Sequence, residues 1–322
     1  MIRSAGLVLS CVLFAVAVQG EAQSQPQSSP VGEWKMAKPL PAPRNEVALA
    51  AVGVKVYVIG GAIGGNAVPQ VDEYDPAADA WTPRAEMPKG LDHLGVAVIG
   101  NMIYTVGGFV GSVHRGAVDA LHRYDISADK WETLPSMKAP RGSVGVAVLD
   151  GKIHAIGGRG LDNQVTVATH EVYDPATNKW TEAAPLPKPR DHMAVVAVDG
   201  KIHAIGGRIT NPASRVGDHD IYDPKTNTWT SGPPLPTARS GLAASLYQGL
   251  AVVLGGELPP DTFPQNEAFD AKAGTWKTLA PMPAGRHGTS AAVAGRNLYV
   301  VAGSLKPGSG DVTNQTIVFT LP

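Results

Sequence analysis

Two landmarks recur along this chain at a nearly constant interval. The octapeptide KIHAIGGR occupies residues 152–159 and again residues 201–208, 49 positions later. A Gly-Gly pair, or Ala-Gly once, ends an apolar run six times at intervals of 47 to 50 residues: Gly60, Gly107, Gly157, Gly206, Gly255 and Ala302. After each of the first five comes an aromatic residue, with a tryptophan seven positions further on: Tyr74 and Trp81, Tyr124 and Trp131, Tyr173 and Trp180, Tyr222 and Trp229, Phe269 and Trp276. Repetition at this period indicates a fold made of successive similar units.

Each unit can be divided into four short strands, which we designate a to d in chain order. In the fourth unit they are MAVVAVDG, KIHAIGG, HDIYDP and TWTSG, short apolar or alternating runs bounded by turn residues. Gly-Gly closes strand b, where glycine accepts a positive φ without strain. Asp-Pro followed by Asn or Asp, between strands c and d, is typical of hairpin turns. We expect the Tyr and Trp of each unit to lie between neighbouring sheets, since each can bury a large flat surface.

The recurrent Gly-Gly, Tyr and Trp resemble those of the kelch repeat, and the resemblance extends from about Trp34 to Pro322. It implies an all-β fold, a β-propeller whose blades have four antiparallel strands each. The sixth unit has its aromatic residue at Phe319, and the seven-residue spacing would place its tryptophan beyond Pro322. Trp34, in GEWKMAKPLPAPR, matches the missing strand d. We therefore expect a six-bladed kelch propeller closed by an N-terminal strand, which removes open sheet edges.

The composition supports this fold and excludes one class of partner. The 37 glycines and 27 prolines favour short strands with tight turns, and a charged fraction of 17% is too low for a disordered or coiled-coil chain. The net charge is −1 and no dense Lys/Arg block occurs. A protein that neutralises phosphates would carry a basic stripe, so nucleic acid is not an expected partner.

The N-terminal segment has the pattern of a secretory signal peptide. Arg3 precedes an apolar run from Ala5 to Val18, and small and polar residues follow. Fourteen residues are too few to cross a bilayer comfortably, so we expect no membrane span. The expected organisation is a signal peptide over residues 1–22, a flexible leader over 23–32 and the propeller over 33–322. Cleavage would make the protein periplasmic or secreted and would remove Cys11, its one cysteine.

One face of the propeller carries the sequence variety that binding loops show. The b-to-c loops differ in length and charge, whereas the opposite turns are short and alike. The residue sixteen positions before each Gly-Gly or Ala-Gly should lie on the same face, and it is arginine in every repeat except that of Leu91: Arg44, Arg141, Arg190, Arg239 and Arg286. Further candidates for ligand binding on this face are His93, His192, Arg159 and Arg208.

Two interpretations of the arginines stay open. Guanidinium groups bind carboxylates and sulfates through two donors, so a ring of them would suit an acidic ligand. Alternatively they tie the blades together through carboxylates on strand c, namely Asp72, Glu171, Asp220 and Glu267. The histidines of the repeated octapeptide, His154 and His203, occupy the position of Tyr57 in another blade, and we interpret them as structural.

Catalytic interpretations depend on resemblance to particular kelch proteins. The secreted copper oxidases that share the central domain of galactose oxidase need a cysteine cross-linked to tyrosine, which the mature chain lacks, so we expect no copper site. The periplasmic sialic-acid mutarotases carry a catalytic Glu after a glycine, with an Arg six residues later. Gly256-Glu257 matches that Glu, but Phe263 stands where the arginine would be. Glu257 is therefore the one catalytic candidate, and we expect neither a metal site nor a cofactor.

The sequence thus predicts an exported, monomeric kelch propeller that binds an acidic carbohydrate, or an envelope or extracellular protein, through its Arg-bearing face. A cofactor-free sugar epimerase or mutarotase is the alternative. The fold alone cannot choose between binding and catalysis, because propellers host unrelated functions.

Overall fold

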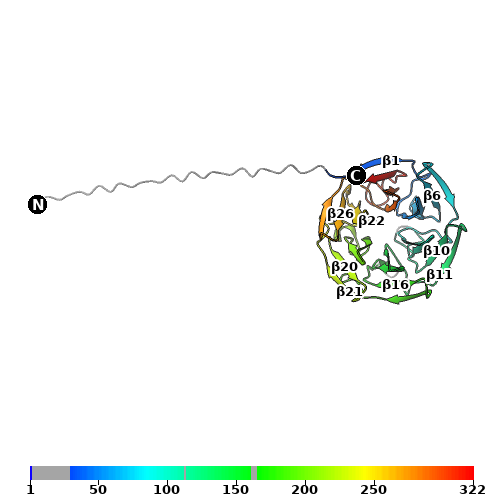
Figure 1. The fold of residues 1–322 in the computed structure, drawn as a ribbon, viewed down its shortest axis with the longest axis horizontal. Helices are drawn as coiled ribbons and strands as arrows, with labels where there is room; N and C mark the ends of the chain where they lie inside the picture. Colours follow the sequence, from blue (N-terminus) through cyan, green and yellow to red (C-terminus); the bar gives the residue numbers. More distant parts are fainter. Residues whose placement is uncertain (2–29, 112–113, 161–164) are drawn as a thin grey trace.

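Six four-stranded antiparallel sheets are arranged around a central channel in a closed ring (Figure 1). The computed structural model describes Met1 and residues 30–111, 114–160 and 165–322. Residues 2–22 of the expected signal peptide and residues 23–29 of the leader lie outside the described residues. Within the described residues, no helix has the length and apolar character needed to cross a membrane.

The strands of each sheet follow one another from the channel to the rim. Strand a lines the channel in every blade: β2 (Ala48–Val52), β8 (Gly95–Ile99), β13 (Gly145–Leu149), β18 (Ala194–Val198), β22 (Ala243–Tyr247) and β28 (Ser290–Ala294). Strand b comes next: β3 (Lys55–Ile59), β9 (Met102–Val106), β14 (Lys152–Ile156), β19 (Lys201–Ile205), β23 (Leu250–Leu254) and β29 (Asn297–Val301). Strand c follows: β6 (Val71–Asp75), β10 (Leu121–Asp125), β16 (His170–Asp174), β20 (His219–Asp223), β26 (Asn266–Asp270) and β30 (Thr316–Thr320). Strand d forms the rim: β7 (Ala80–Arg84), β11 (Lys130–Leu134), β17 (Lys179–Glu182), β21 (Thr228–Ser231), β27 (Thr275–Thr278) and β1 (Glu33–Ala37).

The N-terminal strand closes the ring as the sequence predicted. β1 pairs antiparallel with β30, and Trp34 is the partner of Phe319 in that register. The two rings lie 4.9 Å apart between centroids, the separation that Tyr74 and Trp81 show in the first blade. The all-β, six-bladed propeller with four antiparallel strands per blade is confirmed.

The tryptophans of the six repeats join each blade to the one before it. The indole Nε1 of every repeat tryptophan donates to a main-chain carbonyl of the connection leading out of the preceding blade, at 2.7 to 2.9 Å: Trp34 to Ala280, Trp81 to Lys38, Trp131 to Ala85, Trp180 to Pro135, Trp229 to Ala184 and Trp276 to Pro233. The c-to-d turn adds a second link. Asp79 accepts from the Lys38 N–H at 2.8 Å and from the Tyr74 hydroxyl at 2.5 Å. The Tyr and Trp of each repeat therefore lie between sheets, as expected.

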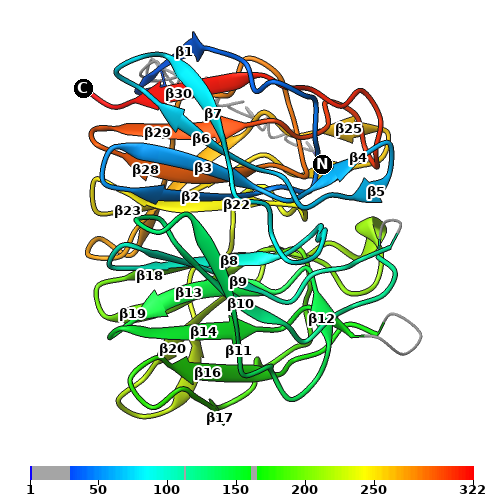
Figure 2. The ribbon, with the colours of Figure 1, turned by 90° about the vertical axis from the view of Figure 1, so that its right-hand side faces the viewer.

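The Gly-Gly pair allows strand b to end against the neighbouring blade. Gly60 and Gly61 have φ of 59° and 94°. A Cβ on Gly60 would stand 2.4 Å from the carbonyl oxygen of Leu91, which no side chain could tolerate. The loops that follow contain the short strands β4 (Ala62–Ile63), β5 (Asn66–Ala67), β15 (Arg159–Gly160), β24 (Glu257–Leu258), β25 (Asp261–Thr262) and the 3-10 helix η2 (Pro212–Ser214). β12 (Arg141–Gly142), in the d-to-a connection before the third blade, pairs with β15. Viewed from the side, β4, β5, β12 and β25 all lie at the same face of the ring (Figure 2).

Candidate functional site

The channel opens onto this loop face through a ring of six residues, one from each blade. All six have left-handed backbone angles, with φ between 49° and 72°: Glu46, His93, Ser143, His192, Gly241 and Gly288. Main-chain bonds link neighbours around the ring, including Ser143 N to His93 O at 2.9 Å and Gly241 N to His192 O at 2.9 Å. Four of the six are not glycine. A non-glycine residue with this φ has a strained backbone, and such strain is found most often at functional sites. We call these six residues the mouth ring.

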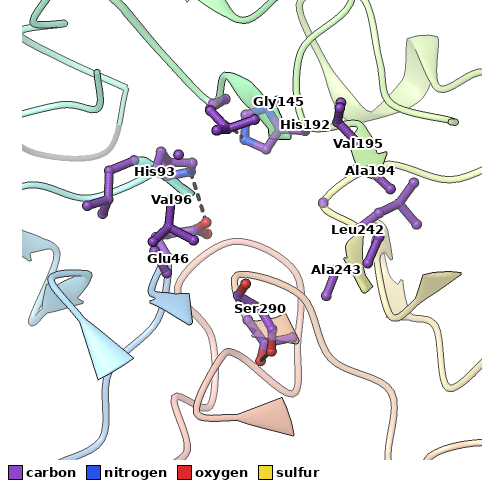
Figure 3. A pocket seen from close by; sticks show the side chains of 18 of the residues that line it. Glu46, His93, Val96, Gly145, His192, Ala194, Val195, Leu242, Ala243 and Ser290 are labelled. Carbon is purple, nitrogen blue, oxygen red and sulfur yellow. Dashed lines mark hydrogen bonds and ion pairs between the residues drawn. The ribbon is translucent and has the colours of Figure 1, made fainter. Parts of the chain in front are cut away.

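Below the mouth ring lies a cavity of about 260 Å³. Its walls consist of four consecutive residues from each blade, and the mouth ring is the outermost layer: 46–49, 93–96, 143–146, 192–195, 241–244 and 288–291. Below the mouth the lining side chains include the apolar Val96, Val195 and Leu242 and the hydroxyl of Ser290 (Figure 3). The site is therefore a small pocket with a polar entrance and a wall of mixed apolar and polar character.

His93 is held between two carboxylates at one side of the mouth. Its Nδ1 lies 2.7 Å from Asp92 Oδ1 and its Nε2 lies 3.0 Å from Glu46 Oε2. Burial alone would lower the pKa of His93, but the charges of Glu46 and Asp92 outweigh it and raise that pKa above its usual value. Burial raises the pKa of Asp92, whose Oδ2 has no hydrogen-bond partner among the described residues.

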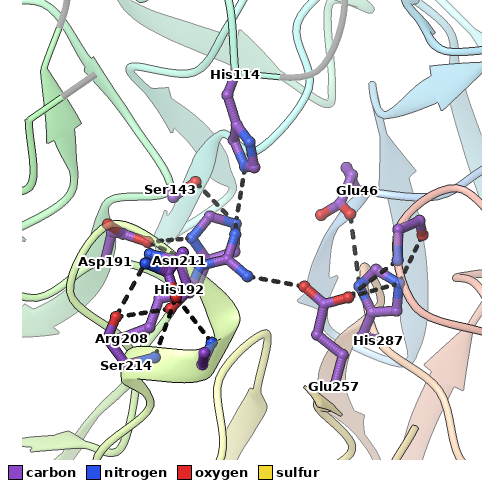
Figure 4. Close-up of polar contacts among 12 residues, drawn as sticks. Glu46, His114, Ser143, Asp191, His192, Arg208, Asn211, Ser214, Glu257 and His287 are labelled. Atoms are coloured by element: carbon purple, nitrogen blue, oxygen red, sulfur yellow. Dashed lines mark hydrogen bonds and ion pairs between the residues drawn. The ribbon is translucent and has the colours of Figure 1, made fainter. Parts of the chain in front are cut away.

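His192 occupies the equivalent position two blades further on, with different partners. Its Nδ1 lies 2.5 Å from Asp191 Oδ1, and its Nε2 lies 2.9 Å from Arg208 Nη2, 3.1 Å from His114 Nε2 and 3.3 Å from Ser143 Oγ (Figure 4). Burial and the nearby Arg208 charge lower the pKa of His192 well below its usual value. Because Arg208 only donates, its bond shows that Nε2 of His192 carries a lone pair directed into the mouth.

A chain of charged groups continues from His192 to the opposite side of the mouth. Arg208 Nη1 lies 2.8 Å from Glu257 Oε1, and Arg208 Nε lies 3.2 Å from Asp191 Oδ1. Glu257 Oε2 accepts from the Gly308 N–H at 3.0 Å and lies 3.5 Å from His287 Nε2. Burial would raise the pKa of Glu257, but His287, the Gly308 N–H and Arg208 together lower it. Glu257 is therefore a buried carboxylate at the site and not an isolated surface group.

The five repeat arginines lie elsewhere. Their side chains are almost fully buried, and none of them lines the cavity. Four are paired with the strand c carboxylates that the sequence indicated: Arg44 with Asp72, Arg141 with Glu171, Arg190 with Asp220 and Arg239 with Glu267. The fifth, Arg286, donates to the Gln315 side chain at 2.9 Å. This is the geometry of braces within each blade, which agrees with the second of the two interpretations left open by the sequence.

The sixteen-residue spacing of these arginines has the same explanation. Four of them donate to the carbonyl of the first residue of the Gly-Gly or Ala-Gly pair, at 2.7 to 3.3 Å: Arg44 to Gly60, Arg190 to Gly206, Arg239 to Gly255 and Arg286 to Ala302. The side chain thus fixes the corner where strand b leaves the sheet. A ligand-binding role for these five arginines stays a prediction.

The other candidates divide between the mouth and the blades. His93, His192 and Arg208 converge at the mouth. Burial lowers the pKa of His114 beside them, and the nearby charges of His93, His192, Arg208 and Arg159 lower it further. His154 and His203 lie inside the blades, where they bond other histidines, His170 at 2.9 Å and His219 at 2.8 Å. Their position agrees with the structural role inferred for them.

Sequence reasoning missed the association of three imidazoles. His93, His114 and His192 each offer one nitrogen within 4.8 Å of the others. His114 comes from the b-to-c loop of the second blade, and His93 and His192 come from mouth-ring positions two blades apart. The repeated Asp-His dipeptide at residues 92–93 and 191–192 was the available signal. It could not reveal that a loop residue would join them.

Comparison with known proteins agrees with this architecture. The model of the KLHDC2/KLHL20/DRC7 Kelch-repeats domain matches residues 88–256 and 144–321, and that of the Kelch motif matches residues 43–88. The chain belongs to the kelch-repeat family.

Individual kelch relatives match only part of this chain. It is 33% identical to Kelch-like ECH-associated protein 1B of Danio rerio over 91 residues, which is 27% of this chain and 16% of that protein. It is 36% identical to F-box protein AFR of Arabidopsis thaliana over 69 residues, 21% of this chain and 18% of that protein. The chain thus spans less than a fifth of the length of these relatives.

A solved structure extends the likeness over the whole propeller. The structure of YjhT superposes with a TM-score of 0.74 and covers 88% of this chain and 96% of its own. The two sequences are 18% identical, so the likeness shows a common fold.

Proposed function

We propose that this kelch propeller binds a small acidic sugar in the mouth of its channel. The observation that carries the proposal is the pocket itself, about 260 Å³ with a polar entrance formed by residues from several blades. Pockets for small molecules combine mostly apolar walls with a few well-placed polar groups. The valine and leucine side chains of the wall suit the C–H faces of a sugar ring, and the mouth and Ser290 offer donors and acceptors for its hydroxyls. A protein ligand on the same loop face would not need such a pocket.

Two arginines at the mouth suit the acidic group of such a sugar. Arg159 and Arg208 occupy the same position in neighbouring blades, directly after Gly-Gly. Arg208 lies 2.9 Å from His192 and 2.8 Å from Glu257, so its guanidinium stands between two blades at the entrance (Figure 4). A guanidinium group can receive a ligand carboxylate through two parallel hydrogen bonds.

Titration calorimetry with glucuronic acid, a sialic acid and glucose tests the proposal. We expect the two acids to bind and glucose to bind more weakly. Replacing Arg208 by Gln should weaken binding of the acids about tenfold or more, because a hydrogen bond to a charged group contributes about 1.5 to 3 kcal/mol. Arg123→Gln is the matched control, since Arg123 pairs with Glu132 on the outer strands. Equal affinity in the Arg208 and Arg123 variants, or no binding by either acid, would contradict the proposal.

A second candidate function, mutarotation or epimerisation of the bound sugar, has its own supporting observation. The mutarotase-like motif is incomplete in the sequence, because Phe263 stands where an arginine would follow Glu257. In the structure Arg208 of the preceding blade reaches Glu257 at 2.8 Å, so a Glu–Arg pair is present nevertheless. A carboxylate beside a sugar can act as a general base. Anomer exchange measured by NMR should then be faster with the protein and should lose that acceleration in Glu257→Gln.

We also propose that the protein acts outside the cytoplasm. The support is the N-terminal pattern of Arg3 followed by an apolar run. Sequencing the N-terminus of the protein recovered from the periplasm or medium should give a start near residue 21 or 23. Recovery from the cytoplasm with Met1 intact would contradict this.

A further inference from the structure

We propose that the channel mouth binds one divalent transition-metal ion, with zinc as the first candidate, through His93, His114 and His192. One nitrogen of each imidazole lies within 4.8 Å of the other two. Each histidine is at least half-buried at the entrance of the cavity. Three imidazoles leave a coordination position open, which is the arrangement of zinc sites that bind water or a ligand. This inference goes beyond the proposed sugar binding and does not depend on it.

The separation of two of these nitrogens is close to what a tetrahedral ion requires. Zinc–nitrogen bonds are about 2.0 to 2.1 Å long, so two nitrogens of a tetrahedral site lie about 3.3 Å apart. Nε2 of His114 and Nε2 of His192 lie 3.1 Å apart. The ring centroid of His93 lies 4.6 Å from that of His114 and 5.1 Å from that of His192, and its nitrogen lies within 4.8 Å of theirs, so His93 has to move closer to share an ion with them.

Two buried aspartates orient the histidines as metal ligands are oriented. Asp92 Oδ1 lies 2.7 Å from Nδ1 of His93, and Asp191 Oδ1 lies 2.5 Å from Nδ1 of His192. Both aspartates are fully buried. A carboxylate bonded to Nδ1 fixes the ring and leaves Nε2 as the ligand atom, which is a recurrent feature of zinc sites. Nε2 of His192 carries the lone pair that such a bond needs.

The charges of the site also suit a dication. Four carboxylates and two guanidinium groups surround the three imidazoles: Glu46, Asp92, Asp191, Glu257, Arg159 and Arg208. With ionised carboxylates the four acids and two guanidinium groups carry a net charge of −2, which a divalent ion would neutralise, and His93 would release any proton it holds when it binds the ion. The side chain of Glu46, 3.0 Å from His93 Nε2, can also supply an oxygen ligand.

Metal binding has to displace two existing contacts. Arg208 donates to His192 Nε2 at 2.9 Å, and Glu46 pairs with His93 Nε2. Arg208 has other partners in Asp191 and Glu257, at 3.2 and 2.8 Å, and can keep them if its Nη2 moves away from His192. Arg208 is therefore a competitor of the ion for the His192 lone pair.

Calorimetric titration of the metal-free protein with ZnCl₂ is the direct test. The protein must carry no polyhistidine tag. A parallel titration with Cu²⁺ is followed by electron paramagnetic resonance. We expect one equivalent of zinc per chain, and copper spectra with hyperfine coupling from imidazole nitrogen. His114→Gln should weaken zinc binding at least tenfold, and so should His192→Gln. The control is His122→Gln, because His122 lies on β10 and bonds Thr133 away from the mouth.

His114 is partly exposed on a loop, so its replacement should leave the melting temperature unchanged and keep the test decisive. Asp191→Asn should weaken zinc binding about 10- to 100-fold, as loss of an orienting carboxylate does at other metal sites. No stoichiometric zinc binding, or an affinity in folded His114→Gln equal to that of the His122→Gln control, would overturn the proposal. Repeating the sugar titrations in EDTA separates the two proposals, because only the metal site is then emptied.

Discussion

At the residue scale, one repeat position has the same backbone conformation in every blade, whereas its residue type varies among Glu, His, Ser and Gly. The mouth ring keeps left-handed φ angles in all six blades, but the side chains are Glu46, His93, Ser143 and His192, followed by glycine at Gly241 and Gly288. Two positions earlier, in every blade except that of Leu91, an arginine points into its own blade and acts as a brace. The repeat therefore fixes the backbone of the mouth ring but not the side chains that a ligand would meet there.

The braces should be measurable as stability. Arg141 and Glu171 are both about 1% exposed, so Arg141→Leu leaves a buried carboxylate without its partner. We expect the free energy of unfolding to fall by about 3 to 5 kcal/mol, measured by urea denaturation. The second blade has Leu91 and His122 at these two positions. The double variant Arg141→Leu, Glu171→His should therefore be more stable than the single one, and equal loss in both would contradict the bracing role.

Two histidine pairs should make stability depend on pH. The Ala184 carbonyl lies 3.1 Å from His170 Nδ1, which must carry the proton, so His170 Nε2 accepts from His154 Nδ1. Burial lowers the pKa of His154 to about 4 and that of His170 to about 3. The unfolded chain, with ordinary pKa values near 6.5, therefore binds more protons between pH 6.5 and 4. Stability should be greatest above pH 6.5 and fall as pH decreases, by up to about 1.4 kcal/mol per pH unit for each histidine.

Urea denaturation at a series of pH values measures this dependence. The first blade has Tyr57 and Val71 where the third has His154 and His170. The double variant His154→Tyr, His170→Val should therefore unfold with a shallower pH dependence below pH 6.5. An unchanged slope would show that the pair does not titrate as described.

At the element scale, the closing strand is the part of the fold on which the ring depends most. β1 is distant in sequence from β30, its partner, and supplies the Trp34 bond to Ala280 at 2.9 Å. Without it β30 would become an exposed edge.

Trp34→Ala should lower the free energy of unfolding by about 3 kcal/mol. This is the lower end of the about 3 to 5 kcal/mol that loss of a buried tryptophan costs, because Trp34 is half-buried. Deleting the residues before Pro39 should cost more, since it also exposes β30. Met36→Ala is the control on the same strand, because Met36 is 60% exposed. Thermal melting of the truncated protein within a degree or two of the intact protein would contradict six-bladed closure.

Strand order and closure could be predicted because their signals repeat in register. Gly-Gly, Tyr and Trp mark each sheet, and the position of Trp34 identified the last blade. The sequence could not predict which side chain before strand a points to the channel. The repeat arginine points into its blade, whereas the residue two positions later, with its positive φ, lies at the channel mouth. The His114 contribution could not be predicted either, because it depends on how a loop of variable length folds over the mouth.

At the scale of the whole molecule, the closed ring brings residues from separate repeats to one entrance. Arg208 belongs to the fourth blade and Glu257 to the fifth, and their contact at 2.8 Å exists only because these blades are neighbours. The inter-blade tryptophan bonds keep the six entrances in register. The central claim is that this entrance, and not the outer rim, receives the ligand.

Protection from alkylation tests that claim most directly. In a Cys11→Ser background, Ser143→Cys places the one thiol in the mouth ring, and Thr181→Cys places it on β17 at the rim. The rate of iodoacetamide modification is measured for each with and without saturating glucuronic or sialic acid. We predict that one of these sugars slows modification at position 143 at least severalfold and leaves position 181 unchanged. Equal rates at position 143 with and without both sugars would contradict the account.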